Sequence, residues 1–380
     1  MTVKPESQAL AAQASRCVAC GLCVPHCPTY RKLESEADSP RGRVMLIRAL
    51  AEGRLAAEPT LVTHLDRCLV CRACEAVCPA GVKYGELIDG ARAWLAAEGK
   101  KPRGLAGWLP AVLSAPPLLA AAAMRLRGFY PARGERQGTV SLFLGCVTRL
   151  ADGSTLRAAI FVLTHLGFDV RVPRGQGCCG AMHQHAGEQE QAAQLARKNI
   201  EVFAKTSLDA TEPILFCATG CGATLVEYAR YGTEGEAFAH RAQDVVSFLA
   251  RAPGWERLPI APLAQTVAVH EPCSGRNVLR NAADVYGLLG RIPGLQAVPL
   301  AGNEQCCGAA GLYFLRQPAL ARRLRADKMP RAGDALRMLV STNQGCAHWL
   351  KQGLSEAGHR LEVEHPVQLV ARQLGFTGRC

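Results

Sequence analysis

The chain has 380 residues, 49% of them hydrophobic, and a formal net charge of +12 at pH 7. This composition excludes a mainly disordered chain, and the length is enough for two or three domains with hydrophobic cores. The basic residues are scattered and not interleaved with aromatic ones, so we expect no nucleic-acid partner. An anionic membrane face or acidic protein subunits would equally explain the charge.

The 18 cysteines indicate the compartment in which the protein works. Thiols that are kept for metal binding survive in a reducing environment, whereas an oxidising one would pair them. The first residues, MTVKPESQALAAQ, contain no long apolar stretch with a cleavage site. We therefore expect no secretory signal and a cytoplasmic protein.

Eight cysteines follow one spacing, C-x2-C-x2-C-x3-C-P, written twice as CVACGLCVPHCP and CLVCRACEAVCPA. This spacing is typical of bacterial two-cluster ferredoxins, in which the fourth cysteine of each motif binds the other cluster. We therefore predict two [4Fe-4S] clusters and a function in electron transfer. The first ligand set is Cys17, Cys20, Cys23 and Cys78, and the second ligand set is Cys68, Cys71, Cys74 and Cys27.

A zinc site or a disulfide framework is the alternative for these eight cysteines. Zinc sites are built from pairs of ligands with wider gaps, and disulfide scaffolds belong to short secreted chains. The spacing therefore favours clusters over both.

Residues 105–124 contain no charged side chain and are long enough to span a membrane. Pro110, Pro116 and Pro117 interrupt them, and proline breaks a helix. We predict a broken helical linker that packs on protein. The alternative is a helix that lies on a membrane surface, which the two arginines that follow would favour.

From residue 139 onward, short apolar strands alternate with amphipathic helices in two similar copies. We predict strands at 140–144 and 267–269, and helices at 154–166, 278–289, 188–204 and 318–328. In each copy the first strand ends at one cysteine, a Cys-Cys-Gly unit follows, and a further cysteine comes later. This pattern indicates a duplicated α/β unit.

Four cysteines in each copy lie at strand ends and in loops, where they can close around one centre. The predicted metal ligands are Cys146, Cys178, Cys179 and Cys221 in the first copy, and Cys273, Cys306, Cys307 and Cys346 in the second. Cys217 is a candidate for an extra ligand. The occupant stays open between zinc, a cubane and another iron–sulfur cluster, and buried thiols without metal are the alternative.

The Cys-Cys-Gly units resemble the cysteine-rich CCG domain of the heterodisulfide-reductase-B-like family, and the order of motifs resembles the glycolate oxidase iron–sulfur subunit family. The stretches that carry the resemblance are DSPRGRVMLIRAL, HLDRCLVCRACEAVCPAGVKYGELID, CCGAMHQHAGEQ, ATGCG, CCGAAGLYFLRQP and STNQGCAHWL. The resemblance implies a subunit without catalytic residues of its own. It would take electrons from FAD-containing dehydrogenase subunits that oxidise glycolate or a related 2-hydroxy acid. A membrane quinone-type acceptor would receive them at the cytoplasmic face of the inner membrane.

The chain departs from the heterodisulfide reductase pattern, which has a further cysteine where this sequence has Ala218 and Asn343. This departure weakens, without removing, the hypothesis of a thiol–disulfide enzyme. Two more hypotheses stay open: the iron–sulfur subunit of a lactate or glycerol-3-phosphate dehydrogenase, and a scaffold that binds structural zinc.

Two minor features lie beside the predicted pockets. His183, His185, His270 and Glu271 could bind metal or carry protons, but we favour supporting hydrogen bonds or surface positions. Residues 175–180 satisfy G-x-G-x-x-G, yet cysteines occupy the middle of the motif and the second copy lacks its first two glycines, so we expect no dinucleotide site.

The predicted architecture is α + α/β. It consists of a helical ferredoxin-like domain (1–100), a linker (101–138) and two CCG repeats (139–255 and 256–380).

Overall fold

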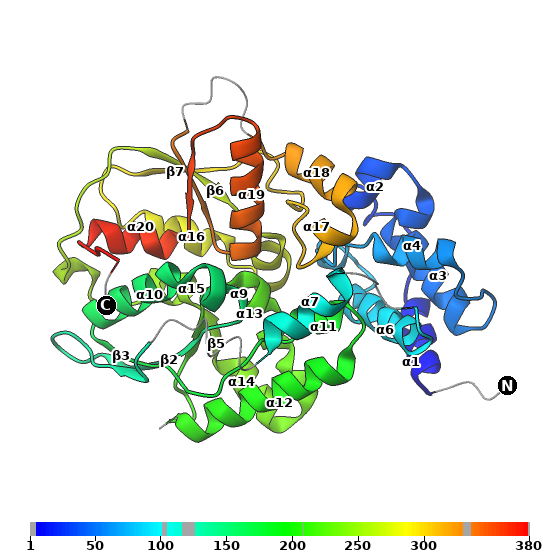
Figure 1. The fold of residues 1–380 in the computed structure, drawn as a ribbon, viewed down its shortest axis with the longest axis horizontal. Coiled ribbons are helices and arrows are strands. Elements are labelled where there is room, and N and C mark those ends of the chain that lie inside the picture. Colours follow the sequence, from blue (N-terminus) through cyan, green and yellow to red (C-terminus); the bar gives the residue numbers. More distant parts are fainter. Residues whose placement is uncertain (1–4, 101–104, 116–125, 208, 330–335, 379–380) are drawn as a thin grey trace.

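The computed structural model describes residues 5–100, 105–115, 126–207, 209–329 and 336–378. Helices within residues 5–97 lie at one end of the molecule, and two mainly parallel sheets with their helices form most of the rest (Figure 1). The fold is therefore α + α/β, which confirms the predicted class.

The amino-terminal part is helical, and prolines start several of its helices. The elements are α1 (Pro5–Ser15), α2 (Pro28–Leu33), η1 (Glu36–Asp38), α3 (Pro40–Ala51), α4 (Pro59–Asp66), α5 (Ala73–Ala76), α6 (Tyr84–Ala97) and α7 (Leu105–Ser114). Pro28, Pro40 and Pro59 occupy first-turn positions, where the missing N–H costs no hydrogen bond. Ile47, Leu65 and other buried apolar residues form the core of this part.

The two halves of the remaining chain repeat one order of parallel strands and connecting helices, and the first half has additional elements. The first half has β1 (Phe129–Tyr130), β2 (Gly138–Phe143), α9 (Val147–Ala151), α10 (Gly153–His165), β3 (Phe168–Arg171), α11 (Ala181–His185), α12 (Gln189–Thr206), β4 (Ile214–Phe216), α13 (Thr219–Leu225), η2 (Val226–Tyr231), α14 (Thr233–Arg241), β5 (Ala242–Asp244), α15 (Val245–Arg251) and η3 (Trp255–Arg257). The second half has β6 (Thr266–His270), the π-helical turn η4 (Gly275–Leu279), α16 (Ala282–Leu289), β7 (Gln296–Pro299), α17 (Tyr313–Arg316), α18 (Pro318–Ala326), β8 (Met338–Ser341), α19 (Gln344–Glu356), β9 (Glu362–Glu364) and α20 (Pro366–Gln373).

Apart from the additional strand β1, the two sheets share one strand order, which confirms that the α/β unit is duplicated. The first sheet runs β1-β3-β2-β4-β5 and the second β7-β6-β8-β9, and all pairs are parallel except β1 with β3. Each first strand, β2 or β6, thus lies between its two successors. Chain crossovers leave such a strand toward both sides, so the carboxyl ends of the central strands face a crevice where ligands bind in α/β folds.

In each half, one amide side chain from the loop before the Cys-Cys-Gly unit forms hydrogen bonds with the backbone at the end of the first strand. Gln176 accepts a hydrogen bond from Leu144 N (2.7 Å) and donates one to Leu142 O (3.0 Å). Asn303 does the same with Glu271 N (3.1 Å) and Val269 O (2.8 Å). The duplication therefore extends to side-chain hydrogen bonds just before each Cys-Cys-Gly unit.

The two halves pack against each other through their helices and share one hydrophobic core. Helix α10 of the first half packs on α20 of the second, and α15 packs on α16 in the reciprocal contact. Buried Val140 and Leu142 of β2 share this core with Val267 and Val269 of β6. Two similar helix–helix contacts, one from each half, therefore hold the two sheets together.

Part of the predicted linker is helical. Helix α7 contains Pro110, and residues 116–124 of the apolar stretch lie outside the described residues. Among the helices described, none has the length and apolar character needed to cross a membrane.

Candidate metal centres

The two ferredoxin-type motifs fold into the same loop. In each, the second and the fourth residue after the first cysteine have a left-handed backbone: Ala19 (φ 55°) and Gly21 (φ 82°), then Val70 (φ 51°) and Arg72 (φ 57°). A β-branched valine in this region is an outlier, and such strain persists only where the surrounding structure enforces it. Its repetition indicates a loop shaped to present cysteines.

The second ligand set surrounds one internal cavity. Cys27 of the first motif and Cys68, Cys71 and Cys74 of the second line this cavity together. Burial raises the pKa of Cys71 well above its usual range, and the neighbouring thiols Cys273, Cys27 and Cys68 raise it further. Thiolates gathered here need positive charge nearby, which the iron of a cluster supplies. The residues present therefore fit the predicted cluster, although ligation stays a prediction.

The first ligand set lies nearer the surface. Cys20 is exposed, and Cys17, Cys23 and Cys78 are half-buried. Val18 and Leu22, which lie between these cysteines in the chain, are 70% and 57% exposed. This loop therefore presents apolar side chains to solvent next to a predicted cluster.

A buried arginine supplies positive charge beside the second ligand set. Arg43 donates hydrogen bonds to Asp38 Oδ1 (3.1 Å) and, at 4.0 Å, to the sulfur of Cys27. Burial acts to lower the pKa of Arg43, but Tyr84, Cys68, Cys27 and Asp38 outweigh it and raise the pKa above the usual range. The guanidinium is therefore charged and balances part of the negative charge of thiolates.

The cysteines of the first half meet in what we name the first cysteine pocket (Cys146, Cys178, Cys179 and Cys221). The sulfur atoms of Cys146 and Cys178 are 3.4 Å apart. Cys146 follows β2 and Cys221 lies in α13, just after β4. The pocket is thus at the carboxyl ends of adjacent parallel strands, where the topology opens a crevice.

The second cysteine pocket (Cys273, Cys306, Cys307 and Cys346) occupies the same place in the second half. Sulfur–sulfur distances are 3.1 Å between Cys307 and Cys346, and 4.0 Å between Cys273 and Cys306. One ring nitrogen of His270 and the sulfur atoms of Cys307 and Cys346 all lie within 4.8 Å of one another. Four soft donors in a buried crevice fit a transition metal or an iron–sulfur cluster.

Two positions that drew attention in the sequence lie outside these pockets. Cys217 packs in the core between the halves, where burial, together with Asp244 and Asp152, raises its pKa. Asn343 caps α19, accepting hydrogen bonds from the backbone N–H groups of Gly345 (3.1 Å) and Cys346 (3.4 Å). The residue at the position of the missing cysteine therefore shapes the helix that carries Cys346.

The second ligand set touches the second cysteine pocket. Asn277 Nδ2 donates a hydrogen bond to the backbone carbonyl of Cys71 at 2.7 Å. Cys71 is also close enough to Cys273 and Cys306 for these thiols to influence one another's pKa. The spacing of the cysteines gave no indication of this contact, because Cys71 and the second cysteine pocket lie far apart in the chain.

Comparison with known proteins identifies the parts of the chain. Residues 13–82 match the 4Fe-4S dicluster domain, and residues 140–226 and 267–351 match the Cysteine-rich domain. The glycolate oxidase iron-sulfur subunit of Escherichia coli (strain K12) is 33% identical, over 94% of this chain and 93% of that protein. The chain belongs to the family of glycolate oxidase iron–sulfur subunits.

Further members and relatives of the family agree with this assignment. The probable glycolate oxidase iron-sulfur subunit of Bacillus subtilis (strain 168) is 30% identical over 90% of this chain and 89% of that protein. Lactate utilization protein A of Shouchella clausii (strain KSM-K16) is 26% identical over 61% of this chain and 98% of that protein. The predicted family and the iron–sulfur character of the chain are confirmed, while the number of clusters stays a prediction.

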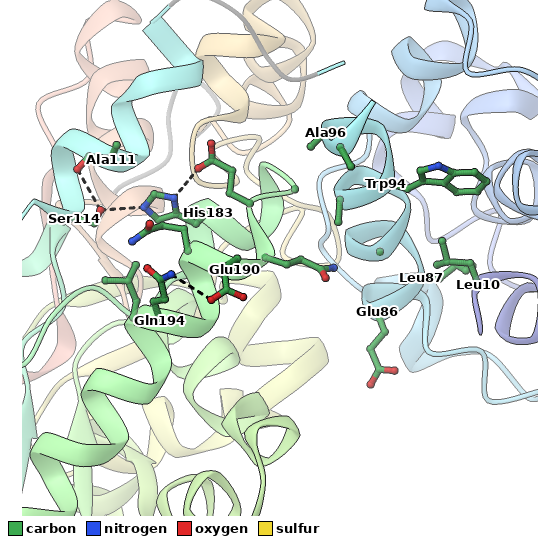
Figure 2. Close-up of a pocket in the computed structure, with 18 of the residues that line it drawn as sticks. Leu10, Glu86, Leu87, Trp94, Ala96, Ala111, Ser114, His183, Glu190 and Gln194 are labelled. Atoms are coloured by element: carbon green, nitrogen blue, oxygen red, sulfur yellow. Dashed lines mark hydrogen bonds and ion pairs between the residues drawn. The ribbon is translucent and has the colours of Figure 1, made fainter. Parts of the chain in front are cut away.

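A cavity of about 1350 Å³ lies between α1, α6, α7 and α12 and has no cysteine in its lining (Figure 2). His183 borders it and is held by Ser114 Oγ (3.0 Å) and Glu188 Oε2 (2.7 Å). His185 bonds Asp89 Oδ1 (3.0 Å) across the boundary with the amino-terminal helices. These two histidines therefore make supporting hydrogen bonds, whereas His270 lies with the cysteines.

Arg43, Tyr84, Asn277 and Lys328 are site residues that the sequence analysis did not single out. The sequence contains one signal for Lys328, which is a difference between the two copies. The residue seven after Ala321 is this charged lysine, whereas the residue seven after Ala192 is the neutral Asn199.

Proposed function

We propose that the chain is the electron-transfer subunit of a glycolate or related 2-hydroxy acid dehydrogenase and is not catalytic alone. In this proposal the two predicted ligand sets hold two [4Fe-4S] clusters, the two cysteine pockets bind further metal, and the predicted domain boundaries are kept. FAD-containing subunits oxidise the substrate, and a membrane quinone-type acceptor receives the electrons. Each cluster, when bound, takes up and releases one electron at a time.

The observation that carries the proposal is the arrangement of the second ligand set. Its cavity is lined by cysteines of both motifs and adjoins the second cysteine pocket through Cys71. The first ligand set, by contrast, lies nearer the surface, with Cys20 exposed. This order suits a path that starts at an exposed site and leads inward.

The chain's own residues support such a path. Arg43 holds positive charge beside Cys27 and Cys68. Arg72, in the second motif, pairs with Glu75 (2.5 Å) and with Glu227 of the first half, so the motif is tied to the repeat. Exposed Val18 and Leu22 offer an apolar contact for a partner subunit close to Cys20.

The proposal is tested with anaerobically purified full-length protein. Alone, it should contain iron, be reduced by dithionite and fail to oxidise glycolate. With the co-expressed flavoprotein subunits, glycolate should reduce its clusters. Glycolate oxidation by the chain alone, or an iron-free product, would defeat the proposal.

Substitution of the exposed loop tests where the partner binds. Leu22→Ser should weaken co-purification of the flavoprotein about tenfold while iron content is unchanged. Leu55→Ser is the matched control, because Leu55 is also exposed (45%) but lies outside the motif. Equal loss of the partner in both variants would show that the loop is not the contact.

A further inference from the structure

The two cysteine pockets occupy equivalent positions but have different neighbours. In the first half, Phe143 at the end of β2 pairs with Phe216 of β4. In the second half, the same positions hold His270 of β6 and Ser341 of β8. All four residues are buried. A phenyl ring offers no ligand to a metal, so the second pocket contains a donor that the first lacks.

His270 is oriented by its neighbour on the sheet. Its Nδ1 forms a hydrogen bond with Ser341 Oγ at 2.9 Å. Metal-bound histidines typically use one ring nitrogen for such a bond, which fixes the ring, and the other for the metal. Such an arrangement would leave Nε2 of His270 for the metal. One of the two ring nitrogens lies within 4.8 Å of the sulfur atoms of Cys307 and Cys346, which are themselves this close to one another.

A buried lysine marks the same pocket. Lys328 is 1% exposed, and its Nζ donates to Gly302 O at 2.7 Å. Burial lowers its pKa, whereas all four cysteines of the second cysteine pocket act to raise it. The first half has neutral Asn199 at this position, as each residue comes seven after the alanine (Ala192 or Ala321) that packs on the glycine of the Cys-Cys-Gly unit. A buried ammonium group is stabilised where thiolates are negative.

We propose that the second cysteine pocket binds its metal through His270 as well as through cysteines, as a mixed thiolate–imidazole site, whereas the first pocket binds through cysteines alone. This proposal adds a ligand to a site named in the proposed function. It rests on one part of that function, namely that the second cysteine pocket holds metal. The metal is a borderline-soft transition ion, either iron in a cluster or zinc. Imidazole in place of thiolate removes negative charge and raises the potential of an iron–sulfur centre.

The second cysteine pocket lies next to the second ligand set, so its ligands would affect electron transfer between the two sites. Cys71 of the second ligand set lies near Cys273 and Cys306, and Asn277 donates a hydrogen bond to its backbone carbonyl. With iron bound, the second pocket would therefore be the more oxidising pocket and the one next to a cluster.

The test uses full-length protein that is produced with ¹⁵N-labelled histidine and purified without oxygen. Metal analysis first decides between iron and zinc. For iron, electron–nuclear double resonance of the reduced protein should show a ¹⁵N coupling. For zinc, X-ray absorption at the zinc edge should show one nitrogen at about 2.0–2.1 Å. The wild-type result alone can overturn the inference, since absence of nitrogen from the metal would contradict it.

Variants then assign the nitrogen. His270→Phe, which copies the first pocket, should abolish the nitrogen signal, and His348→Phe, at an exposed position two residues after Cys346, should keep it. A signal that persists in His270→Phe, or metal content that does not change in Cys307→Ser, would overturn the inference. In both outcomes the ferredoxin-type clusters, with about eight irons at four per cluster, would still be seen. An iron-free protein would instead defeat the proposed function.

Discussion

The hydroxyl of Tyr84 donates a hydrogen bond to the sulfur of Cys68 at 3.6 Å. Both residues are buried, and both line the cavity of the second ligand set. A hydrogen bond to a ligating sulfur stabilises the reduced, more negative cluster and so raises its reduction potential. Tyr84→Phe should therefore lower that potential by about 40 mV, which corresponds to about 1 kcal/mol for one electron. A redox titration followed by electron paramagnetic resonance measures the shift.

The matched control is Tyr30→Phe. Tyr30 lies in α2, three residues after Cys27, and within the described residues its side chain makes no hydrogen bond to sulfur. The potential of this variant should stay that of the wild type. An equal shift in both variants would show that loss of the Cys68 hydrogen bond is not the cause.

Arg43 should be important for stability because its ion pair with Asp38 is buried on both sides. Removing one partner of a buried pair typically costs about 3–5 kcal/mol. Since Arg67 also contacts Asp38 (3.2 Å), we expect Arg43→Gln to lower the free energy of unfolding by about 3 kcal/mol, with loss of iron. Anaerobic denaturant unfolding and iron analysis measure both.

Arg48→Gln is the control in the same helix. Arg48 pairs with Glu52 at 2.8 Å, but both side chains are about one-third exposed. Such a pair contributes about 0.3–0.5 kcal/mol. If the two variants were destabilised alike, burial of the charge would not be the reason for the effect.

Gly308 should tolerate no side chain. Its φ is +87°, and a Cβ would lie 2.6 Å from the carbonyl oxygen of Ala321. Gly311, in the same loop, has φ +62° but open space around a Cβ. Gly311→Ala should cost only about 1–2 kcal/mol of backbone strain. Gly308→Ala should cost more and deplete metal from the second cysteine pocket, because the neighbouring Cys306 and Cys307 must shift.

Melting temperature and metal content of the two glycine variants decide the matter. A Gly308→Ala protein with the stability and metal content of Gly311→Ala would show that the loop gives way without disturbing the cysteines.

His365 should make the protein sensitive to acid. It caps α20 through a hydrogen bond from Val367 N to Nδ1 (3.2 Å), and burial lowers its pKa to about 3. In the unfolded chain histidine takes up a proton below about pH 6.5. The lowered pKa therefore leaves stability intact above pH 6.5 and reduces it as the pH falls toward 3, by about 2 kcal/mol at pH 5.

His365→Asn keeps a capping side chain and removes this proton. The difference in unfolding free energy between pH 7 and pH 5 should therefore shrink by about 2 kcal/mol. His240→Asn, at a position whose side chain is 79% exposed, should leave the difference unchanged. A variant at His365 with the wild-type pH dependence would contradict the prediction.

The duplicated unit was predictable from the sequence because each copy repeats the order of strand, cysteine and helix. Strands such as β2 and β6 were predicted close to their observed bounds. Short strands such as β5 and β9, of three residues each, were not, because three residues carry too little hydrophobic pattern. The reciprocal packing of α10 on α20 and α15 on α16 was also missed, since helix periodicity shows that a face is buried but not what covers it.

The amino-acid sequence alone was enough to predict the kind of chemistry. Cysteine spacing within a motif acts over a few residues, where the backbone geometry of one loop decides which side chains can meet. It therefore predicted the family, the repeat and the candidate ligands. Three relationships became visible in the folded chain: Cys71 adjoins the second cysteine pocket, His270 lies with Cys307 and Cys346, and Phe143 occupies the equivalent place in the first half. These relationships depend on how separate strands and loops pack together in space, which no local spacing encodes.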